Sequence, residues 1–372
     1  MGMLKGIFCV LAAFVLMSCD PIGKNPPEFE VKDKTVLIYM VANNNLSSNA
    51  TSNIDDLKSG YIPEEDNLLI YLHDAKNIPI LLKLHKGTDG ETLQDTVYRF
   101  PIRNSAEPET LTSVMSVTKT MFPANEYGMF LWSHGTGWLP EGYYSTKSFG
   151  AENGVEMDIK DLVKALPYKL SFVVYDACLM GSIEVAYQMK DSVDYIISSP
   201  AEILSNGFPY GKIMEHIFRT PTDLQGVAKE FYDFYNSQSG SSRSATISVV
   251  KAKALEEVAA AAAPLFEKYR DKLSSFSQND VQRYYRSDRK WFFDFGDLMI
   301  QLAGEQEATP VMEALDKAVI YKAATPEFLG IKINPKKYSG LSTYIPLYPS
   351  DPELDAYYKE LQWNKDVQML AD

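Results

Sequence analysis

Two short apolar runs, each followed by a chemically reactive side chain, constrain the fold of this 372-residue chain more than any other feature. Residues 127–133 lead into His134, and residues 171–175 are followed shortly by Cys178. An apolar run that stops at small residues is typical of a parallel strand reaching the ligand-binding edge of an α/β sheet. Because neighbouring parallel strands end at the same edge, we expect the imidazole and the thiol to meet there.

Strand-like and helix-like patterns alternate through the first half of the chain. Asp158 is placed to cap a helix over residues 159–166, whose apolar side chains recur at helical spacing. This alternation predicts an α/β fold, in which a largely parallel sheet carries helices on both faces. We expect strands at 35–42, 67–72, 127–133, 171–175 and 195–199, a hairpin of 78–85 and 96–102, and helices at 52–61, 109–122, 159–166 and 181–190.

The second half of the chain is richer in helical patterns. Helices are expected from residue 222, over 253–273 with a break or kink at Pro264, over 281–286 and over 292–303. Further strands are expected at 245–250, 319–323 and 342–347, and residues 135–157 are expected to form a loop. The sequence therefore indicates a core at 35–220, on which a helix-rich part with late strands, 221–372, is packed.

The N-terminus has the pattern of an export signal. A short basic start at residues 1–5 precedes an apolar stretch, residues 6–17, that is too short to span a bilayer. A small residue followed by Cys19 resembles the lipoprotein box of bacteria, in which the cysteine is lipidated and becomes the new N-terminus. We expect a signal peptide at 1–18, a tether at 19–34 and an exported protein anchored by lipid to a bacterial membrane, periplasmic or at the cell surface. An ordinary signal peptide cut nearby is the alternative.

Export would leave Cys178 in an unusual position. Of the three cysteines, Cys9 would leave with the signal and Cys19 would carry lipid, so Cys178 would be the one free thiol. Exported proteins normally pair their cysteines or lack them, so a free one favours a use for its reactivity. A buried and inert cysteine is the alternative. The net charge of −13 argues against a nucleic-acid partner, which would require clustered basic residues.

The chemistry that suits these residues is nucleophilic catalysis. A cysteine attacks as the thiolate, and an adjacent imidazole takes its proton and later protonates the leaving group. We therefore interpret Cys178 as nucleophile and His134 as general base. The backbone N–H groups of Gly135 and Cys178 are candidates for an oxyanion hole, since glycine permits close approach of a ligand. No metal ligand or cofactor is nominated, because the four histidines lack metal-binding spacing. A serine esterase is excluded because no Gly-x-Ser-x-Gly motif occurs.

The order of these motifs resembles the clostripain family of bacterial cysteine peptidases, within the caspase-like group. The similar stretches cover most of the mature chain and lie at 37–46, 133–135, 176–181, 293–298, 319–322 and 339–346, with Ser-His-Gly in the second and Asp-Ala-Cys-Leu-Met-Gly in the third. The resemblance implies a caspase-like αβα sandwich with His134 as base and Cys178 as nucleophile. It also implies an endopeptidase whose partners are proteins or peptides with basic residues, cleaved after Arg or Lys.

Two further residues gain a role from this resemblance. Asp176 lies two positions before Cys178, so a strand would project both to one face, and its carboxylate would bind a basic substrate side chain. Its alternative role is to accept hydrogen bonds from the following turn. Lys147 is the only basic residue between His134 and Lys160, in a polar segment where cleavage is tolerated, which predicts self-cleavage after it. Its alternative is a surface lysine in an uncut loop. Some relatives depend on calcium, but the scattered acidic residues nominate no ligands.

Two other functions stay open at this point. A non-catalytic surface lipoprotein would use the same scaffold as a binding module, although it would not need both His134 and Cys178. A cysteine amidohydrolase acting on cell-wall peptide would need both residues but no acidic pocket. Reporter peptides with basic, acidic and neutral residues before the cleaved bond distinguish these functions.

Overall fold

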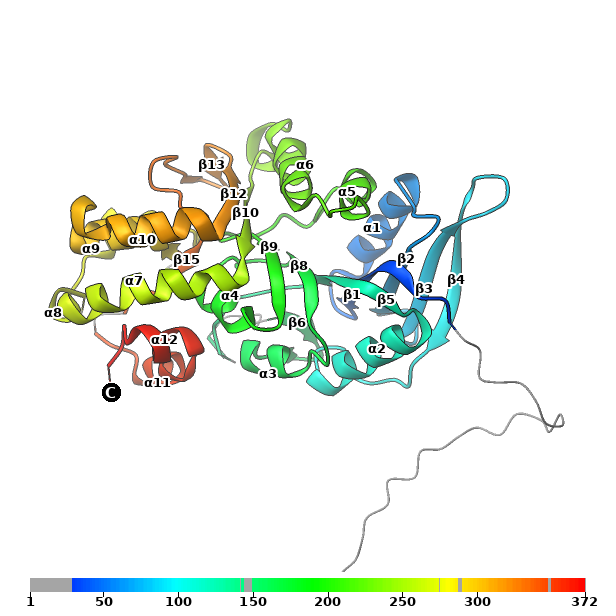
Figure 1. Ribbon diagram of the computed structural model, residues 1–372, viewed down its shortest axis with the longest axis horizontal. Helices are drawn as coiled ribbons and strands as arrows, with labels where there is room; N and C mark the ends of the chain where they lie inside the picture. The colour runs from blue at the N-terminus through cyan, green and yellow to red at the C-terminus, as the bar shows by residue number, and fades with distance from the viewer. Residues whose placement is uncertain are drawn as a thin grey trace, which may run out of the picture.

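A nine-stranded sheet forms the centre of the residues that the structure describes (Figure 1). The computed structural model describes residues 29–140, 142–143, 149–273, 275–286, 290–346 and 349–371. The sheet has the order β12-β10-β9-β8-β5-β1-β2-β3-β4. Its strands are β1 (Lys32–Ala42), β2 (Asn67–Asp74), β3 (Ile80–Lys86), β4 (Thr92–Arg99), β5 (Ala124–Trp132), β8 (Leu170–Asp176), β9 (Val193–Ser198), β10 (Thr246–Lys251) and β12 (Val319–Ala324).

The middle of this sheet is parallel. Strands β9, β8, β5, β1 and β2 run in the same direction. Antiparallel strands complete the sheet at both edges, with the β3–β4 hairpin beside β2 and with β10 and β12 beside β9. The predicted α/β class with a largely parallel central sheet is confirmed.

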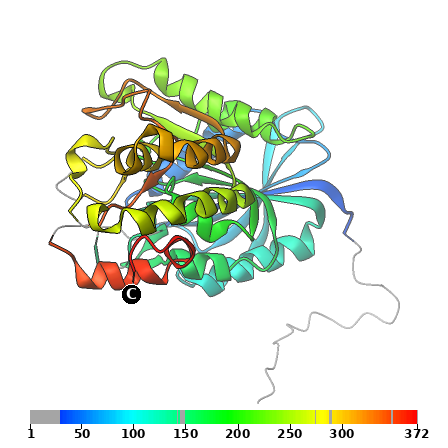
Figure 2. The same ribbon diagram turned by 60° about the vertical axis from the view of Figure 1, so that its left-hand side comes forward.

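Helices cover both faces of the sheet because its strands are apolar on both sides. In β1, Leu37, Tyr39 and Val41 join one buried cluster, and the residues between them join the cluster on the opposite face. Figure 2 shows the sheet between its helices. One face carries α1 (Ser47–Ser59), α5 (Tyr210–Ile217) and α6 (Leu224–Asn236). The other carries α2 (Pro108–Met121), α3 (Ile159–Lys164), α4 (Ile183–Met189), α7 (Leu255–Lys268), α9 (Phe295–Ala303), α10 (Glu305–Ala318), α11 (Pro352–Glu360) and α12 (Gln362–Val367), with the short α8 (Arg270–Leu273) after α7.

Three of the central strands end side by side. In the sheet register, Met40 of β1 lies opposite Trp132 of β5, and Trp132 lies opposite Asp176 of β8. The segments that follow these strands therefore leave the sheet at one edge. Ser133 fixes their relative position, because its Oγ donates to the carbonyl oxygen of Val41 (2.9 Å) and its N–H to that of Asp176 (3.3 Å).

The predicted loop at 135–157 is wrong over its C-terminal part. The chain forms a small hairpin there, with strands β6 (Phe149–Glu152) and β7 (Val155–Met157). Gly154, between the two strands, has a φ of +78°, a left-handed conformation that glycine adopts without strain. The hairpin is short, and its strands contain too few residues for a clear alternating pattern in the sequence.

Helix α7 is not broken at Pro264, because the surroundings of this residue are exposed and water can reach the carbonyl group that loses its helical partner. The helix predicted over 281–286 is wrong. Residues 281–286 form no helix, because their backbone bonds to another segment: the Tyr284 N–H donates to Phe292 O (3.0 Å) and the Asp294 N–H to Gln282 O (2.8 Å). Helices α5, α10, α11 and α12 have no predicted counterpart. The expected strand at 342–347 is reduced to β15 (Ser342–Thr343), which pairs with β11 (Phe293–Asp294).

The sheet continues across residue 220, where the sequence analysis divided the chain. Strand β10 pairs with β9, and β12 pairs with β10. The described parts on both sides of that position therefore share one sheet and its buried clusters. A two-residue pair, β13 (Glu327–Phe328) with β14 (Ile331–Lys332), lies beyond β12.

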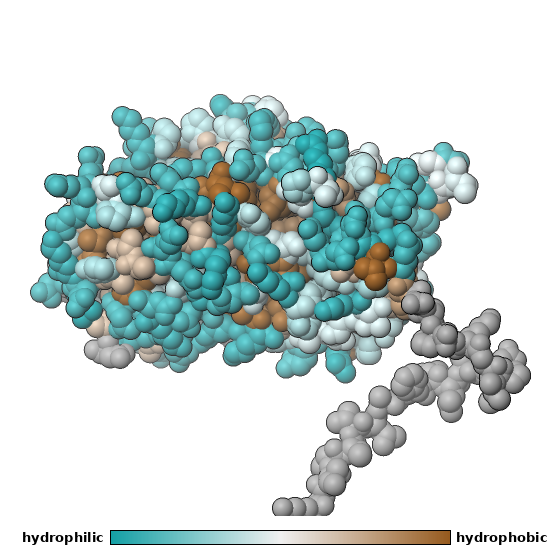
Figure 3. Space-filling model, in the orientation of Figure 1, coloured by the Kyte–Doolittle hydropathy of each residue, from teal (hydrophilic) through white to brown (hydrophobic). Residues whose placement is uncertain are grey.

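Few large hydrophobic side chains are exposed on the described surface. Figure 3 shows one face, on which hydrophobic side chains form small, separate patches. Across the described ranges, we find no helix with the length and apolar character needed to cross a bilayer. The predicted signal peptide at 1–18, Cys19 and most of the predicted tether at 19–34 lie outside the described residues.

Candidate active site

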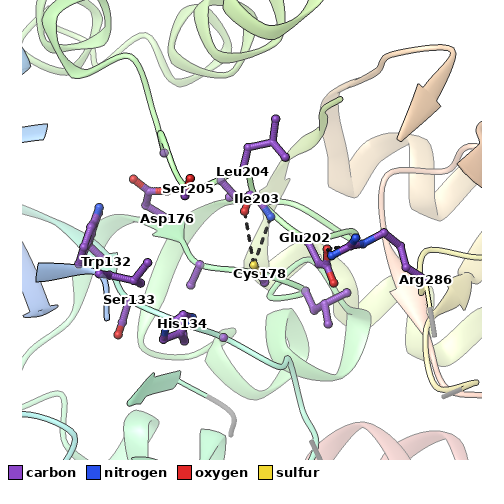
Figure 4. Close-up of a pocket in the computed structure, with 15 residues that line it drawn as sticks. Trp132, Ser133, His134, Asp176, Cys178, Glu202, Ile203, Leu204, Ser205 and Arg286 are labelled. Carbon is purple, nitrogen blue, oxygen red and sulfur yellow. Dashed lines mark hydrogen bonds and ion pairs between the residues drawn. The ribbon is translucent and has the colours of Figure 1, made fainter. Parts of the chain in front are cut away.

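A pocket opens at the edge where β1, β5 and β8 end. Its volume is about 290 Å³. The segments after β5 and β8 contribute His134 and Cys178, which the structure thus brings to one pocket (Figure 4). The pocket is lined by Leu46, Trp132, Ser133, His134, Gly135, Asp176, Ala177, Cys178, Leu179, Glu202, Ile203, Leu204, Ser205, Gly207 and Arg286.

The sulfur of Cys178 is half-buried against the chain that follows β9. Its Sγ accepts a hydrogen bond from the Ile203 N–H (3.3 Å), and the thiol donates to the Ile203 carbonyl oxygen (3.6 Å) (Figure 4). Burial is the largest influence on this thiol and raises its pKa to about 12. In this arrangement the sulfur is a protonated thiol, and a base must remove its proton before it can attack.

His134 has a different partner. Its Nε2 lies 2.7 Å from Oδ1 of Asn45, in the segment after β1. Burial lowers the pKa of His134, which favours the neutral imidazole required of a general base. Within the described part of the chain the thiol and the imidazole share the pocket, but their hydrogen bonds go to Ile203 and Asn45 rather than to each other.

Gly135 packs directly against the loop that carries Cys178. A Cβ atom at Gly135 would lie 2.7 Å from the Cys178 carbonyl oxygen, closer than real Cβ contacts, so a glycine is required for this approach. Among described residues, no hydrogen-bond acceptor pairs with the backbone N–H of Gly135 or of Cys178. Their use as an oxyanion hole stays a prediction.

Asp176 lies at the base of the pocket with its side chain buried. Its Oδ2 accepts hydrogen bonds from the Phe208 N–H (3.2 Å) and the Tyr210 hydroxyl (2.9 Å). Burial, the largest influence, raises its pKa to about 6, although both donors oppose the shift. Oδ1 has no hydrogen-bond partner in the described part of the chain. These donors lie 32 and 34 residues later in the chain and not in the turn that follows β8, and substrate binding by the second oxygen stays a prediction.

An ion pair closes one side of the pocket. The Nε of Arg286 donates to Oε2 of Glu202 (2.7 Å), next to the residue that contacts the sulfur (Figure 4). Sequence reasoning assigned no role to Asn45, Ile203 or Arg286. No local pattern would identify them, since they reach the site through tertiary contacts across 89, 25 and 84 residues.

Lys147 lies outside the described residues. Within the ranges described, no group of three or more His, Cys, Asp or Glu side chains is arranged to hold a metal ion.

Comparison with known proteins gives consistent results. The model of the clostripain family matches residues 38–371. The chain is similar to an inactive zymogen C11 protease from Parabacteroides distasonis, with 36% identity, a TM-score of 0.81, and coverage of 91% of this chain and 99% of that one. It is also similar to a secreted C11 cysteine protease from Bacteroides thetaiotaomicron, solved with an irreversible peptide inhibitor, with 27% identity, a TM-score of 0.78, and coverage of 90% and 98%.

A curated relative matches over a shorter region. Clostripain of Hathewaya histolytica is 28% identical over an alignment 223 residues long, which covers 49% of this chain and 42% of that protein. The match thus spans less than half the length of this relative.

Proposed function

The chain belongs to the clostripain family and is a cysteine peptidase, and from this premise we propose that it is an endopeptidase that cleaves after Lys or Arg, with Cys178 as nucleophile and His134 as general base. The observation that carries this proposal is the shared pocket. It holds the thiol, the imidazole and a buried carboxylate with one unpaired oxygen.

The proposed reaction uses only side chains, backbone groups and water. His134 takes the thiol proton as the sulfur of Cys178 attacks the carbonyl carbon of the scissile bond. The N–H groups of Gly135 and Cys178 stabilise the oxyanion. The intermediate collapses to a thioester when the leaving amine takes the proton from the imidazolium. A water molecule, deprotonated by His134, then hydrolyses the thioester and restores the thiol.

Asp176 is the proposed receptor for the basic side chain of the substrate. Its free oxygen would accept a charge-assisted hydrogen bond from a Lys ammonium or an Arg guanidinium. Ionisation is required, and with a pKa raised to about 6 the carboxyl group is charged at neutral pH. The other oxygen stays with Phe208 and Tyr210, which hold the group in place.

We further propose that the described form is a precursor. Ile203 contacts the sulfur through both its N–H and its carbonyl group, and one similar structure is described as an inactive zymogen. Lys147 is the proposed position of self-cleavage, supported by its place in the sequence.

Export and anchoring are also proposals. One similar protease is described as secreted, and residues 1–19 have the pattern of a lipoprotein signal. A Cys19→Ala protein is expected to move from the membrane fraction to the soluble fraction in a bacterial host, whereas Cys9→Ala leaves the distribution unchanged. Wild-type protein already found in the soluble fraction would contradict the anchor.

The central experiment compares wild type with Cys178→Ala on fluorogenic peptides that carry Lys, Arg, Glu or Ala before the reporter. Wild type, activated if required, is expected to hydrolyse the Lys and Arg peptides, and Cys178→Ala to lose all activity. Equal rates on basic and neutral peptides would contradict the specificity. Cys178 that stays unreactive toward iodoacetamide in active preparations would contradict its role as nucleophile.

A further inference from the structure

The imidazole at the active site has one described side-chain partner, which the proposed mechanism does not use. Nε2 of His134 lies 2.7 Å from the amide oxygen of Asn45, a residue 89 positions earlier in the chain. A neutral imidazole carries a single N–H, and an amide oxygen can only accept a hydrogen bond. The pairing therefore places the proton on Nε2 and leaves the lone pair on Nδ1.

The segment that carries Asn45 is held in place by its neighbours. The side-chain amide of Asn44 donates to the carbonyl oxygens of Val41 (3.0 Å) and Ala151 (2.7 Å). The side-chain oxygen of Asn44 accepts from the Leu46 N–H (2.8 Å). These bonds fix the backbone on both sides of Asn45, although its own side chain is exposed. A fixed acceptor can orient a ring, whereas a mobile one cannot.

Strand β6 supports both partners of this hydrogen bond. It contributes Ala151 to the Asn44 contact, and its Glu152 accepts from the side-chain amide of Asn43 (3.0 Å). The same strand binds the backbone beside the imidazole, since the Gly150 N–H donates to the His134 carbonyl oxygen (3.0 Å). The segment of Asn45 and the backbone of His134 are thus both bonded to β6. This common support holds the amide oxygen of Asn45 at a fixed distance from the ring.

We propose that Asn45 is the positioning residue for His134: its amide oxygen holds the Nε2–H tautomer and thereby makes Nδ1 the atom that takes the proton of Cys178. This assignment rests on the proposed peptidase mechanism, in which His134 is the general base. Asn45 acts through the ring and contacts no reacting atom.

A neutral acceptor suits this role better than a charged one. A carboxylate at this position would stabilise the imidazolium and raise the pKa of His134, whereas an amide orients the ring without adding charge. The titratable and charged groups that line the same pocket as the ring are Cys178, Asp176 and the Glu202–Arg286 pair. Glu152, on β6, pairs with Asn43 and His73.

The first test is spectroscopic and independent of activity. Ring ¹⁵N shifts of His134 are measured in the Cys178→Ala protein, with the signal assigned by its loss in a His134 variant. The Nε2–H tautomer is expected to dominate above the pKa of the ring. Asn45→Ala is expected to give a mixture of tautomers, and Asn45→Asp to keep the tautomer and raise the pKa of His134. A dominant Nδ1–H form, or shifts unchanged in Asn45→Ala, would overturn the proposal.

The second test is kinetic and uses the protein with Cys178 intact. Asn45→Ala is expected to lower kcat by about 10- to 100-fold. This is the range found when a metal-bound histidine loses the hydrogen-bond partner that orients its ring. KM is expected to stay within about twofold, because Asn45 is not among the residues that line the pocket. The matched control is Asn125→Ala, which deletes another exposed amide at the opposite end of β5 and should leave kcat unchanged. A raised KM with normal kcat would overturn the positioning role.

These two tests separate the inference from the proposed function. If Cys178 proves not to be the nucleophile, hydrolysis is lost as an assay but the tautomer measurement still decides the role of Asn45. If the peptidase mechanism is correct and Asn45 plays no part, Asn45→Ala retains full activity and its original tautomer.

Discussion

At the scale of single residues, burial sets the chemistry of this pocket. The thiol of Cys178 and the carboxyl of Asp176 are two positions apart, and burial is the largest influence on the pKa of each. It keeps the thiol protonated, with a pKa of about 12, and brings the carboxyl to about 6, where it ionises just below neutral pH. A thiol with such a pKa needs a base to become a thiolate, whereas the carboxyl of Asp176 is ionised at physiological pH.

Asp176 should impose a pH dependence on the hydrolysis of basic substrates. For wild type, kcat/KM on a Lys peptide is expected to fall as pH drops through about 6, because protonation removes the negative charge. Asp176→Asn should lower kcat/KM at pH 8 by about 10- to 100-fold, equivalent to the 1.5–3 kcal/mol of a hydrogen bond to a charged group, and remove this limb of the profile.

The matched control is Tyr210→Phe, which keeps the charge and removes one donor to Oδ2. Because the Tyr210 hydroxyl lowers the pKa of Asp176, its loss should move the acidic limb to higher pH.

Burial raises the folded pKa of Asp176 above its unfolded value, so its ionisation reduces stability as pH rises from about 4 to 6. Asp176→Asn should therefore be at least as stable as wild type at pH 8, and an unfolded variant would contradict this account.

At the scale of elements, short segments without regular structure are held by buried carboxylates. Asp294 caps α9 by accepting from the Asp297 N–H (2.9 Å), and its second oxygen accepts from the Tyr284 hydroxyl and the Ser339 N–H (both 2.7 Å). Asp297 in turn accepts from the Gln282 N–H (2.8 Å). These bonds tie the backbone of residues 281–286 to α9 and to β11, the strand before it, which explains why these residues form no helix of their own.

Removal of the Asp294 carboxylate should destabilise the whole fold. Asp294→Ala loses a helix cap and leaves buried donors unpaired, so we expect a loss of about 2–4 kcal/mol in the free energy of unfolding. Asp294→Asn can still cap the helix and should lose less. The midpoint of urea unfolding, at unchanged slope, measures both.

A second capping aspartate serves as the control for Asp294. Asp351 caps α11 by accepting from the Leu354 N–H (3.1 Å), at a partly exposed position. Asp351→Ala should cost about 1 kcal/mol, the usual value of an exposed cap. Equal losses at the two positions would show that burial of Asp294 is not the reason for its effect.

At the scale of the whole molecule, the parts of the chain before and after Lys147 contribute strands to the same sheet. Strands β1 to β5 come before it and β8 to β12 after it, and β5 pairs with β8 along five positions from Gly128–Phe172 to Trp132–Asp176. Helices and strands from both sides of this point share each buried cluster. A cut there removes one covalent bond and leaves the non-covalent contacts of the described residues in place.

Self-cleavage after Lys147 should therefore yield two fragments that stay together. Incubated wild type is expected to give two bands on a denaturing gel and one peak, at the position of the intact protein, on gel filtration. Lys147→Ala should remain a single band, while Lys160→Ala serves as the control and is cut normally. A Lys147→Ala chain that still splits between 144 and 148 would refute this cleavage position, and separate fragments would refute the association.

The sequence alone was sufficient for the features that depend on local pattern. Apolar runs of strand length predicted the central sheet, and the positions where they stop predicted the pocket with His134 and Cys178. The cap at Asp158 was also predicted, and its Oδ1 accepts from the Lys160 N–H (2.7 Å). Hydrophobic periodicity and capping are properties of a few consecutive residues, so they can be recognised without the fold.

Only the tertiary structure decided which groups surround His134 and Cys178. Asn45 at the imidazole, Ile203 at the sulfur and Arg286 at the rim arrive from three separate segments, and the register of β1, β5 and β8 brings the first of them to the site. A hydrogen bond between distant segments depends on where the sheet ends each strand and how the following loops fold back. That information is held by the packing of the whole chain, because no short stretch of sequence contains both partners.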